Sequence, residues 1–256
     1  MMGQIHYPPY LERVSLAESN QPVFQQHLAR YQFTMPLVDS KVVLDAASGT
    51  GYGAALLART ARSVVGVDID REAVVASLGD FSGPNLFFAQ MNCTQLGFKT
   101  AAFDPVCALE MIEHIADYAA VLGEIERVLR PGGRLVLSTP NRRPDDPVVP
   151  ANPHHVHEFS SQELAVLLRE FFPRVELYGQ CGGQRAHAWK HGTPLKQRLA
   201  RVDPLGIRRL VPAPLYRGLH RLICAPLPED LQPSDYPITR EGFETGDFLL
   251  AVCVSA

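Results

Sequence analysis

The sequence lacks the patterns typical of membrane-spanning, secreted or disulfide-stabilised chains. Its uncharged stretches fall short of the roughly 18 to 20 apolar residues that a membrane span needs. The start, MMGQIHYPPYLERV, has neither the cationic end nor the apolar core of a signal peptide. The five cysteines are odd in number, scattered and never spaced as CxxC, so neither a disulfide framework nor a thiolate zinc site is indicated. We therefore expect a cytoplasmic chain with reduced thiols.

Acidic residues are scarce in one segment of the chain. The 256 residues carry a net charge of −3, yet residues 185–221 hold nine Lys or Arg against a single acid, Asp203. Such a segment could contact a phosphate-bearing substrate, an anionic membrane surface or a nucleic acid, or it could be a solvated helical face. At 46% hydrophobic residues, the chain can build one large domain, alone or with an appendage.

Apolar runs alternate with helix-like segments along most of the chain. This alternation predicts an α/β fold with a parallel sheet covered on both faces, and ligands bound beyond the carboxyl ends of the strands. A helix is expected from residue 22 to 38, interrupted at Pro36. A capping box is expected where Ser160 and Glu163 begin a helix. The expected strands are 41–46, 63–69, 85–92, 103–110, 134–141, 174–180 and 247–256, and the other helices 49–61, 71–79, 117–133 and 160–172.

The first expected strand ends in a glycine loop with an acid in front of it. In VVLDAASGTGYGAALLA the glycines stand at 49, 51 and 53, so the backbone can approach a ligand closely and the next helix offers free N–H groups. The spacing is GxGxG rather than the GxGxxG of a dinucleotide site. Asp45 before the loop would repel a pyrophosphate and attract an ammonium group, and Asp68 can accept the hydroxyls of a ribose. S-adenosylmethionine satisfies both acids.

Five ordered stretches carry a family resemblance. They are LDAASGTGYG, VVGVDID, AQMNCTQLGF, FDPVCALEMIEHI and LRPGGRLVLSTPN. Together they resemble the class I S-adenosylmethionine-dependent methyltransferases over about residues 22–178 and the final strand. The resemblance implies a Rossmann-like, doubly wound, seven-stranded sheet, mostly parallel with an antiparallel last strand. The implied domains are an N-terminal helical lid (1–38), the cofactor-binding core (39–180), a basic Pro-rich helical cap (181–243) and the final strand (244–256).

The resemblance also implies where the cofactor lies. Gly49 and Gly51 would pass under the methionine part and Asp68 would take the ribose. Ile69 would pack on the adenine, with Asn92 and Cys93 at its amino edge. Either Arg30 or Tyr31 could reach the methionine carboxylate, and a solvated helix charge is the other interpretation of Arg30. Ala47 stands where the family often has glycine, and Asn92 where it often has Asp. The full expected set is Tyr31, Asp45, Ala47, Gly49, Gly51, Asp68, Ile69, Asn92, Cys93 and Glu110.

The stretch EMIEH at 110–114 places two carboxylates and an imidazole together. If a helix begins near Met111, Glu110, Glu113 and His114 converge on one side. With His155 from the following polar loop, the set resembles the metal-dependent small-RNA 2′-O-methyltransferases, and ExxEH alone resembles the ubiquinone-pathway O-methyltransferases. Three roles stay open. Glu110, Glu113, His114 and His155 could bind a divalent Mg, Mn, Fe or Zn ion, Glu113, His114 and His155 could serve as catalytic acid/base groups, or the cluster could only shape the pocket.

The predicted function is O-methylation of a small molecule or of a sugar or glycan hydroxyl. The basic cap suggests a phosphorylated or lipid-linked acceptor and allows peripheral membrane contact. The stretches HLARY and HHVHEFS look like those of methyltransferases that accompany surface-polysaccharide synthesis. RNA 2′-O-methylation is the alternative, but the acidic balance and the lack of an aromatic-rich basic face oppose a nucleic acid. A non-catalytic S-adenosylmethionine-binding module is a third interpretation, which the retained Asp45 and Asp68 disfavour.

Overall fold

A computed structural model describes residues 21–144, 146, 150, 152–191 and 231–256 of the chain. Its centre is one eight-stranded sheet with the strand order β3-β2-β1-β4-β5-β8-β6-β7. Most of the basic segment 185–221 and of the expected cap, and residues 1–20 of the expected lid, lie outside the described residues. The strands are β1 (Val42–Ala46), β2 (Ser63–Asp68), β3 (Leu86–Gln90), β4 (Phe103–Leu109), β5 (Leu129–Pro140), β6 (Arg174–Gln180), β7 (Ile238–Thr239) and β8 (Phe248–Val254).

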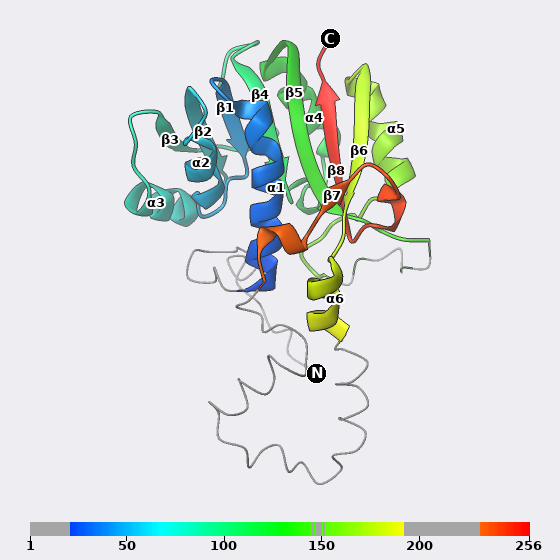
Figure 1. The fold of residues 1–256 in the computed structure, drawn as a ribbon. Helices are drawn as coiled ribbons and strands as arrows, with labels where there is room; N and C mark the ends of the chain where they lie inside the picture. Colours follow the sequence, from blue (N-terminus) through cyan, green and yellow to red (C-terminus); the bar gives the residue numbers. More distant parts are fainter. Residues whose placement is uncertain (1–20, 145, 147–149, 151, 192–230) are drawn as a thin grey trace, which may run out of the picture.

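The strand directions confirm the predicted fold class. Strands β1 to β5 pair in parallel, while β8 lies between β5 and β6 and runs antiparallel to both (Figure 1). The carboxyl ends of β1 to β5 therefore meet at one edge of the sheet. The strand count differs from the expected seven, because the two-residue β7 pairs antiparallel with the end of β6. Strand β7 belongs to the segment expected to form the cap.

Helices cover both faces of the sheet, as buried parallel strands require. Along β1, Val43 packs in one hydrophobic cluster with residues of α1 and α2, while Leu44 packs in another with residues of α4 and α5. No helix among the described residues combines the length and the hydropathy to cross a bilayer. The helices are α1 (Pro22–Val38), α2 (Tyr52–Leu57), α3 (Arg71–Asp80), α4 (Tyr118–Val128), α5 (Ser161–Phe171) and α6 (Gln184–His191), with 3₁₀ turns at Ile112–His114, Pro233–Asp235 and Phe243–Thr245.

Helix α1 lies along the front face of the sheet (Figure 1) and continues through Pro36 to Val38. The expected interruption at Pro36 is therefore wrong. A proline inside a helix removes the hydrogen bond to the carbonyl four residues earlier, here that of Gln32. Because Pro36 and Gln32 are both exposed, water can satisfy this carbonyl. The helix can thus accept the proline in its last turn.

The expected helix from residue 117 to 133 is also shorter in the structure. Helix α4 ends at Val128, and β5 begins at once with Leu129 paired to Phe103. The pairing register then shifts, and the segment RPGG forms an irregular part of β5. It does not end a helix, contrary to the expectation. Gly133 permits this, since a Cβ there would lie 2.7 Å from the carbonyl oxygen of Asp104.

Candidate active site

The loop between β1 and α2 turns sharply on residues in the left-handed backbone region. Ala47, Gly49 and Gly51 have φ values of 57°, 55° and 80°. A Cβ at Gly51 would also lie 2.6 Å from Oγ of Ser77, so only glycine fits there. Ala47 adopts the same conformation at a cost of roughly 1 kcal/mol, which gives a physical reason for glycine at this position in the resembled family.

Asp45 lies at the end of β1, beneath this loop, with 1% of its surface exposed. The hydroxyl of Tyr31 lies 3.3 and 3.4 Å from its two carboxylate oxygens and donates to them. Burial raises the pKa of Asp45 to about 7, against the opposing Tyr31 hydrogen bond and with help from the charge of Asp68. The Tyr31 ring fills the space beside Gly53, where a Cβ would lie 1.9 Å from a ring carbon. Helix α1 thus contacts the glycine loop directly.

Asp68 ends β2 next to the same loop. Its carboxylate oxygens accept the backbone N–H groups of Gly49 and Asp70, each at 2.9 Å, and only 5% of the residue is exposed. A carboxylate offers about four acceptor positions, so these two bonds fix its orientation without excluding hydroxyl donors. The next residue, Ile69, is 64% exposed. Its side chain is therefore open to the expected contact with an adenine ring.

Asn92 and Cys93 follow β3 at the same edge. Asn92 is exposed, and its side-chain oxygen accepts the N–H of Thr94 at 3.0 Å. Cys93 is buried against the glycine loop, and burial raises its pKa to about 11, opposed by a hydrogen bond with the Ala47 backbone. The thiol therefore stays protonated and fills space. The structure thus brings all the expected nucleoside residues to the ends of β1, β2 and β3.

Arg30 in α1 is fully buried, which contradicts its interpretation as a solvated helix charge. Its Nε donates to Oε1 of Gln180 at 2.8 Å, and its guanidinium carbon lies 4.0 Å above the Phe248 ring. Nη1 lies 3.3 Å from Oε2 of Glu110. Both Nη atoms are buried without a hydrogen-bond partner. Contacts with Gln180, Phe248 and Glu110 therefore fix the side chain, while its two Nη atoms can still donate hydrogen bonds.

Glu110 does not share one side with Glu113 and His114, as the expected helix required. With a φ of 53°, Glu110 changes the direction of the backbone after β4. The expected helix is only a short 3₁₀ turn, Ile112–His114. Ser138 of β5 holds Glu110, because its hydroxyl donates to Oε1 at 2.8 Å and also accepts the Glu110 N–H at 3.1 Å. The contacts with Ser138 and Arg30 thus hold Glu110 apart from the group of side chains described next.

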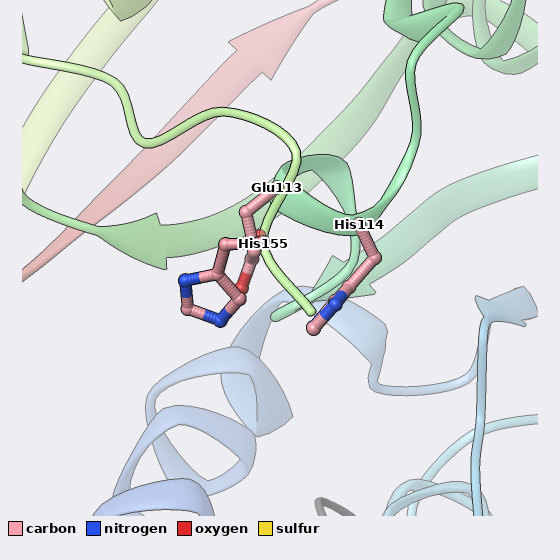
Figure 2. A group of neighbouring side chains, drawn as sticks. All are labelled: Glu113, His114 and His155. Atoms are coloured by element: carbon pink, nitrogen blue, oxygen red, sulfur yellow. The ribbon is translucent and has the colours of Figure 1, made fainter. Parts of the chain in front are cut away.

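Glu113, His114 and His155 converge at the carboxyl edge of the sheet (Figure 2). One potential ligand atom from each lies within 4.8 Å of the others. Glu113 is 1% exposed, and neither of its carboxylate oxygens makes a hydrogen bond of full geometry, although the Thr139 hydroxyl and the Glu113 backbone lie close enough to lower its pKa slightly. Burial, and next the charge of Glu110, hold the pKa of Glu113 well above its usual range. Buried polar atoms without partners are costly, so this cluster has the chemistry of a site completed by a ligand.

The hydrogen bonds of the two rings assign their tautomers. Nδ1 of His114 lies 3.1 Å from the carbonyl oxygen of His154, which can only accept, so Nδ1 carries the proton. Asn152 accepts the His154 N–H with Oδ1 at 3.0 Å and therefore turns its amide nitrogen to Nε2 of His155, 2.9 Å away. Nε2 of His155 is thus an acceptor, and Nδ1 donates to Glu158 at 2.7 Å. Both rings present Nε2 as the lone-pair nitrogen, a donor set that fits a divalent cation as well as a proton.

Three comparisons place the chain among known proteins. Residues 44–137 match the model of a methyltransferase domain. A probable S-adenosylmethionine-dependent methyltransferase of Mycobacterium tuberculosis is 39% identical over 165 residues, covering 63% of this chain and 60% of that relative. A ubiquinone biosynthesis O-methyltransferase of Xanthomonas oryzae pv. oryzae is 31% identical over 172 residues, covering 61% of this chain and 71% of the relative. A Thermotoga maritima methyltransferase structure, described as a possible histamine N-methyltransferase, superposes with a TM-score of 0.60 at 16% identity, covering 91% of each chain.

The fold is that of an α/β protein with acidic side chains gathered at the carboxyl edge of its sheet, the edge where such sheets bind ligands. The chain belongs to the class I S-adenosylmethionine-dependent methyltransferases, as its five motifs indicated. The cofactor of this family is S-adenosylmethionine. The chain spans less than two thirds of the length of the M. tuberculosis relative.

Several residues of the site escaped the sequence prediction. Gln180 and Ser138 hold Arg30 and Glu110, and Asn152 and Glu158 bind the two nitrogens of His155. The sequence could have indicated Asn152 and Glu158, because each stands three positions from His155 in a polar loop.

Proposed function

We propose that this protein transfers a methyl group from S-adenosylmethionine to a hydroxyl oxygen of a small molecule or glycan. When bound, the cofactor supplies a methyl group on a positively charged sulfur. The observation that carries the proposal is the adjacency of two sets at one sheet edge: the buried carboxylates Asp45 and Asp68, and the convergent Glu113, His114 and His155. The first set suits the cofactor, and the second suits the removal of a proton from an acceptor hydroxyl.

The chain's own charges hold the cofactor at both ends. Asp68 accepts the ribose hydroxyls, and the ionised Asp45 attracts the ammonium group of the methionine part. The Nη edge of Arg30 binds the methionine carboxylate, because two parallel N–H groups match two carboxylate oxygens. The guanidinium needs no reorganisation for this role, since Gln180 and Phe248 already fix it. Arg30 is therefore assigned here in preference to Tyr31, whose hydroxyl is bonded to Asp45.

The proton of the acceptor hydroxyl goes to an imidazole nitrogen. Nε2 of His114 and Nε2 of His155 are the lone-pair atoms of their rings, and they stand next to the buried carboxyl of Glu113. A neutral imidazole is a suitable base near neutral pH. Glu113 is buried and the side chain of His155 is 11% exposed, whereas His114 lies open to solvent.

A divalent cation is a second candidate role for the same cluster. Glu113, His114 and His155 would hold the ion, which would lower the pKa of the acceptor hydroxyl. The buried carboxyl of Glu113, whose oxygens make no hydrogen bond of full geometry, favours this role. Glu110, expected as a further ligand, binds Arg30 and Ser138 instead.

Calorimetry with S-adenosylhomocysteine tests the cofactor part of the proposal. We expect binding by the wild type, its loss in Asp68→Asn, and a weakening of about tenfold in Arg30→Lys, which keeps the charge without the fork. Asp80→Asn, an exposed acid at the end of α3, serves as the matched control. A protein that does not bind S-adenosylhomocysteine would contradict the proposal and favour a non-catalytic module of another specificity.

Transfer of a tritiated methyl group tests the acceptor. The panel contains sugar nucleotides, lipid-linked sugars, catechols and RNA, and the product is treated with alkali, which cleaves methyl esters but not ethers. We expect alkali-stable label on a sugar or small-molecule hydroxyl. Label on an amine, on an ester or only on RNA would contradict this acceptor class. For the cation, retained activity in EDTA together with a metal-free native mass spectrum would rule out the metal role.

A further inference from the structure

His155 is held by its neighbours at both ring nitrogens. Its side chain is 11% exposed, and the carboxylate of Glu158 that accepts from Nδ1 is 19% exposed. On the other side, the amide of Asn152 donates to Nε2, the atom that faces the cluster with Glu113 and His114. A carboxylate bonded to Nδ1–H keeps the lone pair on Nε2 and stabilises the ring when Nε2 gains a proton. Nδ1 of His114 instead lies 3.1 Å from a backbone carbonyl oxygen, that of His154.

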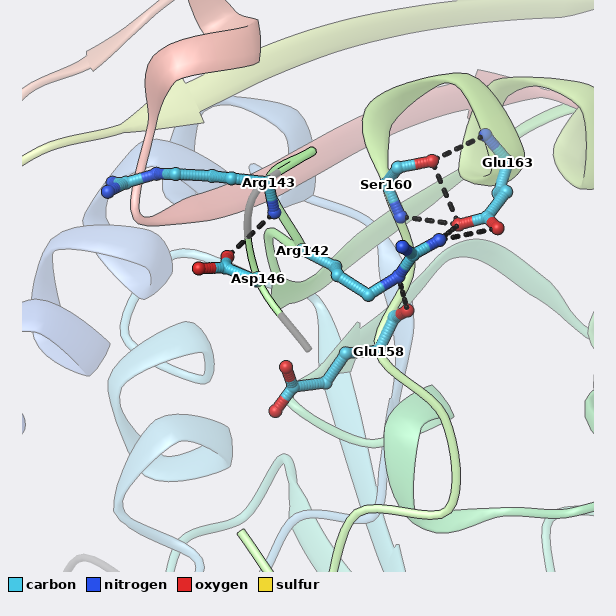
Figure 3. Close-up of polar contacts among 6 residues, drawn as sticks. All are labelled: Arg142, Arg143, Asp146, Glu158, Ser160 and Glu163. Atoms are coloured by element: carbon cyan, nitrogen blue, oxygen red, sulfur yellow. Dashed lines mark hydrogen bonds and ion pairs between the residues drawn. The ribbon is translucent and has the colours of Figure 1, made fainter. Parts of the chain in front are cut away.

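The loop is built to aim the Glu158 carboxylate at this ring. Arg142, just after β5, donates from Nε to the backbone carbonyl of Glu158 at 3.1 Å and from Nη2 to both oxygens of Glu163 at 2.6 Å (Figure 3). Glu163 in turn forms the expected capping box with Ser160 at the start of α5. The Glu158 backbone is therefore tied to a rigid helix end, while its side chain turns away from Arg142 in Figure 3.

The same loop is tied to the turn that carries Glu113. The carbonyl of Glu113 accepts the N–H groups of Val156 at 2.7 Å and His157 at 3.3 Å. The ring of His157 packs 4.4 Å from that of Phe159. The distance between His155 and Glu113 is thus set by backbone bonds on both sides, which gives the preorganisation that a reacting group requires.

We propose that Glu158 and Asn152 are positioning residues of the active site. Glu158 fixes the Nδ1–H form of His155, and Asn152 occupies on Nε2 the hydrogen-bond position that the hydroxyl of the acceptor takes. The proposal rests on the proposed O-methylation and selects His155 over His114 as the ring that receives the acceptor's proton. Asn152 leaves Nε2 when the acceptor binds, and the hydroxyl donates to Nε2 in its place.

Three variants separate these roles. Glu158→Gln keeps an acceptor for Nδ1–H but loses the charge, while Glu158→Ala removes both. Asn152→Asp is almost isosteric and keeps the bond to the His154 N–H, yet it turns an acceptor instead of a donor toward Nε2. That change requires a proton on Nε2 and so removes its lone pair. Glu176→Gln, an acid on β6 whose side chain is 47% exposed, is the control.

Nitrogen-15 NMR of the full-length, histidine-labelled protein reads the ring directly. The spectra are recorded at about pH 8, and His155 is assigned by the signal missing from His155→Gln. We expect a protonated Nδ1 and an unprotonated Nε2 in wild type, in Glu158→Gln and in Glu176→Gln. Glu158→Ala should show a mixture of tautomers, and Asn152→Asp a protonated Nε2. A wild-type ring protonated on Nε2, or a Glu158→Ala spectrum like that of wild type, overturns the proposal.

Kinetics complete the test. We expect kcat to fall at least tenfold in Glu158→Ala and Asn152→Asp, with affinity for S-adenosylhomocysteine unchanged and partial recovery in Glu158→Gln. A purely structural role would instead change cofactor affinity or stability along with kcat. Unchanged kcat in Glu158→Ala overturns the proposal even where the NMR agrees. If the wild type binds no S-adenosylhomocysteine, the proposed function fails by itself, since the NMR measurement needs neither cofactor nor acceptor.

Discussion

Replacing Asp45 by Asn should change how the stability of the protein depends on pH. Asp45 is almost fully buried, and burial raises its pKa from 3.8 to about 7, while the Tyr31 hydroxyl opposes the shift and the charge of Asp68 adds to it. The ionised carboxylate is therefore destabilising in the folded protein without a ligand. Asparagine keeps the shape and an acceptor for Tyr31, but it cannot ionise.

The sign and the size of the effect follow from proton linkage. Below pH about 3.9 both the folded and the unfolded chain hold this proton, and stability does not depend on it. Between about 3.9 and 7 only the folded state holds the proton, so stability falls as pH rises, by about 1.4 kcal/mol per unit. Above pH about 7 the contribution is constant. From pH 5 to 8, Asp45 should therefore remove about 3 kcal/mol from the free energy of unfolding.

Urea unfolding of the wild type and of Asp45→Asn, at about pH 5 and about pH 8, measures this difference. The wild type should lose about 3 kcal/mol more than the variant between the two conditions. Asp39→Asn, at an exposed aspartate that ends α1, should behave as wild type. Equal losses in the wild type and in Asp45→Asn would refute the reasoning, because they would show that Asp45 ionises equally easily in both states.

Three further predictions concern the same region and the loop after β5. The affinity for S-adenosylmethionine should fall about tenfold per unit as pH drops below about 7, since Asp45 must ionise to attract the ammonium group, and calorimetry on Asp45→Asn should show no such slope. Gly53→Ala places a methyl group 1.9 Å from a Tyr31 ring carbon, so thermal unfolding should show a loss of about 1 to 3 kcal/mol; an unchanged midpoint would mean that the ring moves freely. Ser160→Ala removes the capping box shared with Glu163 and should cost about 1 kcal/mol in urea unfolding, with Ser82→Ala at an exposed position as control.

The sequence was sufficient to place the acids and the glycine loop at one edge of the sheet because parallel strands impose a simple rule. A buried strand appears as an apolar run, and the residue that ends it lies at the carboxyl edge beside the ends of its neighbours. Asp45, Gly49 and Asp68 follow from this rule without knowledge of any long-range contact. The structure agrees, since Asp68 accepts the N–H of Gly49.

The rule does not extend to contacts that depend on how distant segments pack. Arg30 and Gln180 are 150 positions apart, and no local pattern distinguishes a buried arginine in α1 from a solvated one. Glu110 illustrates the second difficulty. Helical spacing predicts that it joins Glu113, but the positive φ of Glu110 turns its side chain toward Ser138, and a single backbone angle of this kind leaves no trace in a hydrophobic pattern.

The buried charges of the site argue for a cationic ligand more strongly than the glycine loop does. Asp45, Asp68 and Glu113 are each at most 5% exposed, and Glu110 has a side-chain exposure of 14%, while Arg30 is the buried cation recorded beside them. Burial, and next the repulsion between neighbouring carboxylates, raises the pKa of Asp45 and of Glu113. A pyrophosphate would add to the repulsion, whereas an ammonium and a sulfonium would relieve it. The repulsion that destabilises the site without a ligand is therefore also what favours S-adenosylmethionine over a dinucleotide.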